Sequence, residues 1–155
     1  MWSLAEHAMQ VAVVDWAQLQ ATSIRPLQLL YAIPNGGRRP PKVGREMKAE
    51  GARAGVPDLN LPVRARGFIG LWVEMKSKDG VLSGVQAWWR DHLLAAGHDW
   101  QLCRTIESAI AVLRAHALAA QNEFPEAWTP KPSTPKETPM NQTKPAAAPR
   151  RKGRA

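Results

Sequence analysis

Apolar residues recur at the spacing of an amphipathic helix in three stretches of this chain. In the first stretch Met9, Val13 and Ala17 share one face, which predicts a helix over residues 4–20. A shorter and more polar segment predicts an additional small helix. Together the predicted helices cover 4–20, 42–52, 83–96 and 108–120.

Apolar runs bounded by Gly, Pro, Asn or Asp predict the strands between these helices. The predicted strands cover 27–33, 56–63, 68–76 and 100–104. The short turn at 64–67 predicts that the second and third strands pair as an antiparallel hairpin. The resulting order, α-β-α-β-β-α-β-α, is typical of an α/β fold in which helices flank a mixed sheet.

The chain of 155 residues changes composition near residue 122. Beyond that point Pro recurs among Lys, Thr and Ala, and too few apolar residues remain to offset the entropy cost of ordering the backbone. We therefore predict a folded domain over 1–121 and a disordered, basic C-terminal tail over 122–155. Residues 125–155 contain seven Lys or Arg and two Glu, so they carry +5 of the formal net charge of +8. Such a tail is either a solubilising linker or an arm that binds nucleic acid.

The charge balance and the cysteine content exclude several classes of protein. The 21 Lys and Arg against 13 Asp and Glu favour a polyanionic partner, either nucleic acid or an anionic membrane surface. Cys103 is the only cysteine, which excludes an internal disulfide and a multi-cysteine zinc site. No apolar run approaches the roughly 18 residues that a membrane-spanning helix requires. Glu6 and Asp15 stand where a secretory signal would be apolar, so we expect a soluble protein of a reducing compartment.

The most informative chemistry lies on the predicted hairpin. Side chains alternate along a strand, so Glu74 and Lys76 project from one face while Val73 and Met75 project from the other. Asp58 lies near the start of the neighbouring strand. If Asp58 and Glu74 meet, they form a site of carboxylate oxygens suited to Mg²⁺, beside which Lys76 could orient a water molecule or neutralise a scissile phosphate. The alternative is an ordinary surface ion pair of Glu74 and Lys76, which contributes little to stability.

Two other polar residues border the predicted apolar faces, and each has two readings. Glu6 shares a helix face with Gln10, so it either points inward toward a cation or a donor, or completes a capping box with Ser3. Gln86 lies in the first turn of the helix predicted over 83–96. There it either contacts a phosphate or an attacking water, or forms a capping box with Ser83.

A Gly-rich turn follows the first predicted strand and carries two adjacent arginines. Gly36 and Gly37 permit close approach of the backbone to a ligand. Arg38 and Arg39 are suited to binding phosphate, although an ordinary exposed turn has the same composition. The predicted DNA contacts in the whole chain are Gln10, Asn35, Arg38, Arg39, Arg150, Arg151 and Lys152.

Tryptophan is unusually frequent, with seven residues. Those that fall inside predicted helices or strands, where we expect core packing, are Trp16, Trp72, Trp88, Trp89 and Trp100. A base-stacking role for one of them is the alternative. The four histidines are not spaced like metal ligands, and we expect Cys103 to pack in the core.

Taken in order, these motifs resemble one known family. The matching residues are Glu6 and Gln10, Ile33-Pro-Asn-Gly-Gly37, Glu50-Gly51, Gly55-Val-Pro-Asp58, Glu74-Met-Lys76, Leu82-Ser83, Gln86, Trp89, Leu94 and Gly97. They resemble the VRR-NUC domain, a branch of the PD-(D/E)xK nuclease superfamily, over residues 3–118.

The resemblance implies a restriction-endonuclease-like fold, a mixed β-sheet flanked by α-helices, and a metal-dependent endodeoxyribonuclease. It implies Mg²⁺ or Mn²⁺ held by Asp58, Glu74 and the main-chain carbonyl of Met75. The implied catalytic residues are Asp58, Glu74, Lys76, Glu6 and Gln86, with Lys76 as the catalytic lysine.

Stand-alone members of the family in phages and bacteria look like homodimeric nucleases that act on branched DNA, at junctions or flaps, in repair and recombination. The resemblance therefore implies a homodimer in the cytoplasm of a bacterial or phage-infected cell. The alternatives are a nuclease-like module that binds DNA without cutting it, and a scaffold that acts through its Pro-rich tail.

Overall fold

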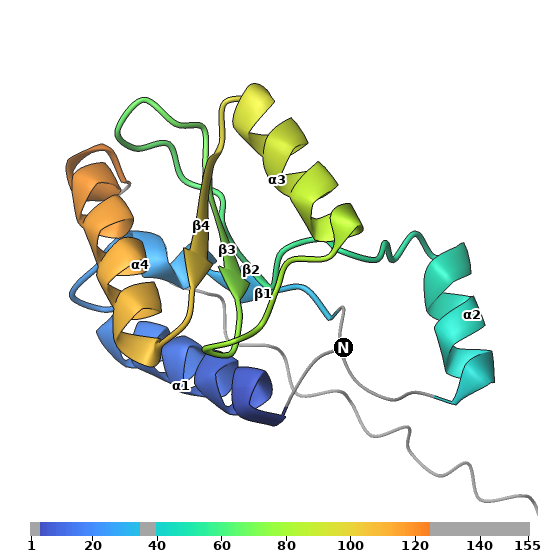
Figure 1. The fold of residues 1–155 in the computed structure, drawn as a ribbon. Helices are drawn as coiled ribbons and strands as arrows, with labels where there is room; N and C mark the ends of the chain where they lie inside the picture. The colour runs from blue at the N-terminus through green and yellow to red at the C-terminus, as the bar shows by residue number, and fades with distance from the viewer. Residues whose placement is uncertain (1–3, 35–39, 125–155) are drawn as a thin grey trace, which may run out of the picture. The chain divides into compact units, whose positions relative to one another are not determined.

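The computed structural model describes residues 4–34 and 40–124, which form a four-stranded sheet with helices around it (Figure 1). The helices and strands are α1 (Leu4–Gln20), β1 (Tyr31–Ala32), α2 (Pro41–Ala49), β2 (Leu59–Leu61), β3 (Leu71–Met75), α3 (Gly84–Ala95), β4 (Asp99–Cys103) and α4 (Ile106–Ala120). Short 3-10 helices cover η1 (Arg25–Leu29) and η2 (Gln121–Glu123). None of the described helices is both long and apolar enough to cross a bilayer.

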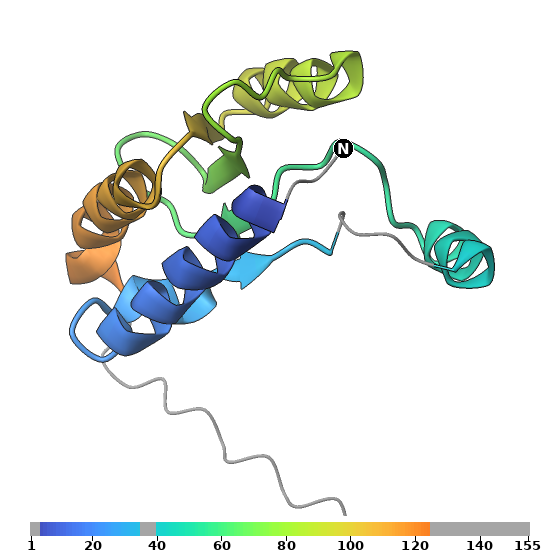
Figure 2. The same cartoon turned by 60° about the horizontal axis from the view of Figure 1, so that its bottom comes forward.

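The sheet carries helices on both of its faces. Its strand order is β1-β2-β3-β4, in which β1 pairs antiparallel with β2, β2 antiparallel with β3, and β3 parallel with β4. Helices α1 and α4 lie together on one face and α3 lies on the other, as Figures 1 and 2 show from two directions. The mixed sheet between helices and the hairpin of β2 and β3 confirm the predicted fold class.

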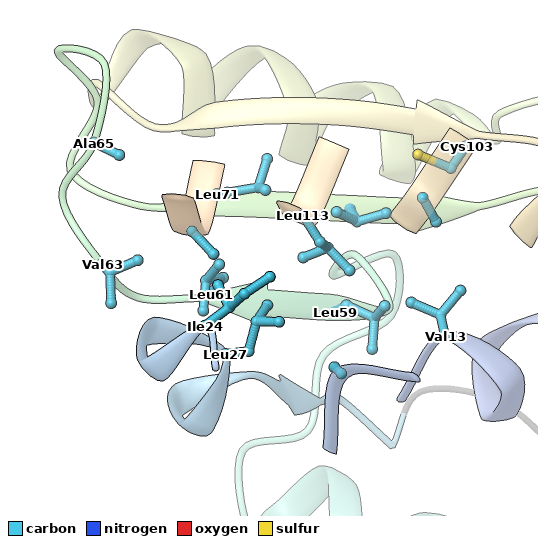
Figure 3. Close-up of a cluster of buried hydrophobic side chains, with 14 of the residues drawn as sticks. Val13, Ile24, Leu27, Leu59, Leu61, Val63, Ala65, Leu71, Cys103 and Leu113 are labelled. Carbon is cyan, nitrogen blue, oxygen red and sulfur yellow. The ribbon is translucent and has the colours of Figure 1, made fainter. Parts of the chain in front are cut away.

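Every second residue of β2 and β3 enters an apolar core with α1 and α4. Leu59 and Leu61 of β2 pair with Val73 and Leu71 of β3, and none of the four is more than 1% exposed. Leu113 of α4 packs in the same cluster, which Figure 3 shows beside the strands. Because side chains alternate along a strand, the residues between these core positions project to the face where α3 lies.

Local sequence sets the ends of the last two helices. The Ser83 hydroxyl accepts a hydrogen bond from the Gln86 N–H, and the Gln86 side chain accepts one from the Ser83 N–H, so a capping box begins α3. Thr105 and Ser108 form the same arrangement, and α4 therefore begins earlier than the predicted residue 108. Gly97, with a φ of 90°, follows α3 in the left-handed region that commonly ends a helix.

The prediction of a strand over 27–33 is wrong for most of its length. The chain forms the 3-10 helix η1 over Arg25–Leu29, and only Tyr31 and Ala32 belong to a strand. Pro26 lies in the first turn of η1. Its fixed φ and missing N–H suit the start of a helical turn and do not suit a strand ladder.

The strands predicted over 56–63 and 68–76 form, but they are shorter than predicted. β2 is limited to Leu59–Leu61, because Pro57 and Pro62 on either side cannot donate to a ladder. Between the two strands, Arg66 and Gly67 both have positive φ, 54° and 85°, and form the tight turn that the hairpin requires.

The tryptophans do not fill the core as predicted. Trp16 is partly buried against the core, while Trp72, Trp89 and Trp100 are half-buried and lie outside the described core cluster. Trp88 is 49% exposed, so its assignment to the core is wrong. The physical reason is that α3 is covered on one side only, and Trp88 lies on its outward side.

Candidate active site

The β2–β3 hairpin places Asp58 beside Glu74. Leu59 pairs with Val73 in antiparallel register, and one step further along the same register Asp58 lies opposite Glu74. The Asp58 carboxylate accepts a hydrogen bond of 2.8 Å from the Met75 N–H, which fixes its side chain against β3. The two acids are 5% and 1% exposed.

Glu74 and Lys76 project from one face of β3, as alternation predicted, and form a buried ion pair. The Lys76 Nζ lies 3.0 Å from the Glu74 Oε1, and Lys76 is only 7% exposed. The alternative of an ordinary surface pair is therefore wrong for these two residues. Burying a charge costs free energy unless the charge has a partner. A buried ammonium next to buried carboxylates is therefore a candidate functional site.

Gln86 forms the capping box that was one of its two predicted roles, while its contact with a phosphate or an attacking water stays a prediction. Its side-chain oxygen accepts the Ser83 N–H in the capping box, which leaves its amide nitrogen to donate to Glu74 Oε1. The cap orients the side chain, and the side chain then orients the carboxylate of Glu74. The start of α3 is thereby joined to the end of β3.

Glu6 reaches the same place from the opposite side of the sheet. It is 3% exposed, and its Oε1 accepts a hydrogen bond of 2.9 Å from the Ser77 N–H, directly after Lys76. The turn that follows leaves no spare room: a Cβ on Gly80 would lie 3.3 Å from the Glu6 Oε1 and 3.2 Å from the Lys76 Cδ. The inward reading of Glu6 therefore holds in the structure, while its predicted cap partner, Ser3, lies outside the described residues.

The crowding of acids changes the proton affinity of Glu74. Its pKa is raised from the ordinary 4.5 to about 7, mainly by burial and then by the negative charge of Asp58. The hydrogen bond and the charge of Lys76 act in the opposite direction, and Glu6 adds a smaller increase. The cluster of Glu6, Asp58, Glu74, Lys76 and Gln86 thus holds three acids for one ammonium.

This excess of negative charge fits a hard divalent cation. Mg²⁺ typically takes one or two protein carboxylates and fills its other positions with water or phosphate oxygens. Asp58 and Glu74 supply two oxygen donors of that kind, and the Met75 carbonyl is a main-chain donor on the same strand. Within residues 4–34 and 40–124, no group of three or more His, Cys, Asp and Glu side chains is arranged to hold a metal ion. A cation would therefore depend on oxygens from water, main chain or substrate as well.

Arg104 is a residue of this site that the sequence analysis missed. Its Nη1 donates to three main-chain oxygens, those of Ser77, Lys78 and Gly80, at 2.7, 3.0 and 2.9 Å. These oxygens belong to the turn that begins beside Lys76 and donates to Glu6. Arg104 therefore holds the turn in place, and no spacing in the sequence signals a bond of this kind.

Among the predicted DNA contacts, Gln10 falls within the described residues. It lies on the same face of α1 as Glu6, is half-buried, and has a side-chain oxygen without a hydrogen-bond partner among the described residues. The remaining predicted contacts lie outside the described residues, and they are Asn35, Arg38, Arg39, Arg150, Arg151 and Lys152. Cys103 is buried in the core, as predicted.

The protein has an α/β fold in which a mixed sheet presents acids and a lysine at a strand end. A solved structure described as a "VRR_NUC domain protein" has the same fold, with a TM-score of 0.62 and 19% sequence identity. The match covers 78% of this chain and 94% of that chain. The protein therefore has a VRR-NUC fold, which confirms the fold implied by the sequence resemblance.

Comparisons by sequence find no such match. No family model matches the chain. No curated protein matches it either. The likeness is thus carried by the three-dimensional arrangement of the strands and helices.

Proposed function

We propose that this protein is a metal-dependent endodeoxyribonuclease that hydrolyses phosphodiester bonds in branched or structured DNA. The observation that carries the proposal is the buried cluster at the end of β3, where Asp58, Glu74 and Lys76 meet with Gln86. Phosphodiester hydrolysis needs groups that neutralise charge developing at phosphorus and that orient a water molecule. The nuclease-like fold supports the proposal independently of the cluster.

Asp58, Glu74 and the Met75 carbonyl would hold Mg²⁺ or Mn²⁺. When bound, such a cation neutralises negative charge on the phosphate and lowers the pKa of water. In the metal-free chain burial and Asp58 raise the pKa of Glu74 to about 7, so a cation that binds this carboxylate would compete with a proton.

Lys76 and Gln86 have separate tasks in this scheme. The Lys76 ammonium donates hydrogen bonds to the attacking water or to a phosphate oxygen, and its position is fixed by the 3.0 Å contact with Glu74. Gln86 holds the same carboxylate from the side of α3. Glu6 accepts the hydrogen bond of the Ser77 N–H and so holds the chain directly after β3 in place.

The substrate form and the assembly follow from the resemblance and from charge. We propose branched DNA and a homodimer, since cutting both strands of a junction needs two such clusters and paired copies supply them. The basic residues at 125–155 contribute affinity for phosphates in a cytoplasmic setting where DNA is present. If they do, removing 125–155 will make the slope of log affinity against log salt shallower by about 0.9 for each phosphate that is no longer neutralised.

Cleavage of a panel of end-labelled DNA forms tests the proposal. Junction, flap, duplex and single-stranded DNA are incubated with the purified chain and Mg²⁺, Mn²⁺, Ca²⁺ or EDTA. We expect nicks in the branched forms with Mg²⁺ or Mn²⁺ and none with EDTA. Glu74→Gln should remove cleavage, whereas Glu107→Gln, an exposed acid at the start of α4, should not.

Two results would contradict the proposal. Equal nicking by Glu74→Gln and by the unaltered chain would show that the cluster is not the source of the activity. A mobility shift without nicks in every metal would instead identify a module that binds DNA without cutting it. Light scattering of the same samples measures whether the chain is paired.

A further inference from the structure

A pocket of about 400 Å³ takes no part in the chemistry described so far. Its lining includes Ile33 after β1, Met47 of α2, Val56 before β2 and Trp89 of α3, with Glu50 and Arg53 in the loop after α2. We infer that this Trp89 pocket binds one unstacked nucleobase of the DNA strand whose phosphate lies at the cluster. The inference rests on the proposed function and adds to it a subsite for the base.

Two sides of the pocket are formed by residues that are connected to the cluster, by a hydrogen bond or along the chain. The Ile33 N–H donates to the Asp58 carbonyl at 2.8 Å, and Val56 stands two positions before Asp58 in the chain. On the other wall, Trp89 lies one helical turn after Gln86, so the two side chains share a face of α3. The lining of the pocket is therefore connected to Asp58 through β1 and to Gln86 through α3.

The indole of Trp89 is a fixed wall of this pocket. Its Nε1–H donates to the Ala54 carbonyl at 3.1 Å, and the ring of Trp88 meets it edge to face with centroids 5.4 Å apart. The loop that carries Ala54 lies close against α3, because a Cβ on Gly55 would lie only 2.7 Å from the Val85 Cγ1. A held aromatic ring is what base stacking requires, since little entropy remains to be lost on binding.

The lining also matches the chemistry of a nucleobase, which has apolar faces and polar edges. Ile33, Met47 and Val56 supply apolar contact, and all three are half-buried. Glu50 and Arg53 are exposed, and neither forms an ion pair with another residue in the described part of the chain. An acceptor and a donor thus remain available for the edge of a base. Base–aromatic stacking tolerates any sequence, because every base has a π face.

A binding measurement that needs no cleavage tests the inference. Fluorescence anisotropy in EDTA compares a labelled oligothymidylate with an oligomer of abasic deoxyribose phosphates of equal length and equal charge. Their difference in affinity isolates the bases, because the phosphate term is the same for both. We expect the unaltered chain to bind the thymidylate about tenfold more tightly, the scale of one stacked base.

Three variants locate the effect. Trp89→Ala should bind both oligomers equally, and Ala52→Leu, which fills the pocket without removing a buried side chain, should do the same. The matched control is Leu94→Ala, an exposed apolar residue of α3 outside the lining that should keep the full preference. Circular dichroism shows which variants are folded. If Trp89→Ala does not fold, the binding preference of Ala52→Leu provides the test.

Equal affinity of the unaltered chain for the two oligomers would overturn the inference, as would a full preference in Ala52→Leu or a loss of the preference in Leu94→Ala. These outcomes are separate from those of the cleavage test. If the chain cleaves DNA but binds the two oligomers equally, the proposed function stands and the base subsite does not. A chain that prefers bases but cuts nothing retains the subsite without the proposed function.

Discussion

The two faces of the β2–β3 hairpin share one backbone and differ in nearly every other respect. On one face Leu59 and Val73 pair inside an apolar core. On the other face, one residue away on each strand, Asp58 and Glu74 stand opposite each other as buried acids. The core face gains free energy from burial, whereas the acidic face loses free energy by desolvation and repulsion.

The difference between the two faces shows how the apolar core holds the acidic cluster together. The apolar pairs fix the register of the hairpin, and the register then holds the acids together although they repel. Neighbouring residues on one strand should therefore respond in opposite ways to substitution. Four predictions test this contrast.

The largest effect is expected on the acidic face. Asp58→Asn should lower the cleavage rate by about 10³-fold, the scale seen when a preorganised group of a transition state is removed. The free energy of unfolding should stay the same or rise, because a charge next to Glu74 is removed and the amide oxygen can still accept the Met75 N–H. Rates on labelled branched DNA and urea unfolding measure the two quantities. Asp15→Asn, an exposed acid on α1, is the control.

Substitution of the adjacent core residue, Leu59, should lower stability and leave cleavage unchanged. Leu59→Ala should lower the free energy of unfolding by about 2–5 kcal/mol, because it leaves a cavity in the core. Cleavage per folded molecule should be unchanged at a temperature where the variant is folded. Leu19→Ala, 78% exposed on α1, should change neither quantity. A loss of cleavage in fully folded Leu59→Ala would show that the two faces are not separable.

The raised pKa of Glu74 predicts a pH dependence of stability in EDTA. The folded chain holds a proton on Glu74 between about pH 4.5 and about pH 7, where the unfolded chain has lost it. Stability should therefore fall as pH rises through this window, by about 3 kcal/mol from this one group. Urea unfolding below and above this pH window measures the decrease in the free energy of unfolding. In Glu74→Gln the part of the decrease that comes from Glu74 should be absent. A cation that binds the cluster should restore stability above pH 7, which unfolding with added Mg²⁺ measures.

The smallest effect is expected at Arg104, which belongs to neither face. Arg104→Ala should lower kcat about tenfold with little change in KM, because it removes the three hydrogen bonds that hold the turn beside Lys76 and leaves the substrate contacts in place. Arg104→Lys should recover part of the rate, since an ammonium has three N–H donors that can bond main-chain oxygens. Arg114→Ala, exposed on α4, is the control. A rise in KM alone would identify Arg104 as a DNA contact instead.

Elements with strong local signals could be predicted from the sequence. Helix α1 has the predicted bounds, and the Ser83 and Gln86 pair begins α3 where a capping box predicts it. The juxtaposition of Glu74 and Lys76 also follows from local geometry, because two residues on one strand must share a face. These features depend on neighbours in the chain.

Features that depend on distant partners could not be predicted in the same way. The bonds of Arg104 join carbonyls more than 20 residues away, and main-chain oxygens have no sequence signature. The helical position of Trp88 favours the core, but only the arrangement of layers reveals which side of α3 is covered. The segment 27–33 is apolar enough for a strand, and Pro26 redirects it into η1.

The turn after Lys76 has a consequence for how the protein comes into being. One of its contacts, Glu6, belongs to the first helix, and the other, Arg104, follows the last strand. A chain still emerging from the ribosome cannot close this turn until nearly the whole domain has left the exit tunnel. The end of β3 therefore gains its last supporting contact late in synthesis, after Arg104 has emerged.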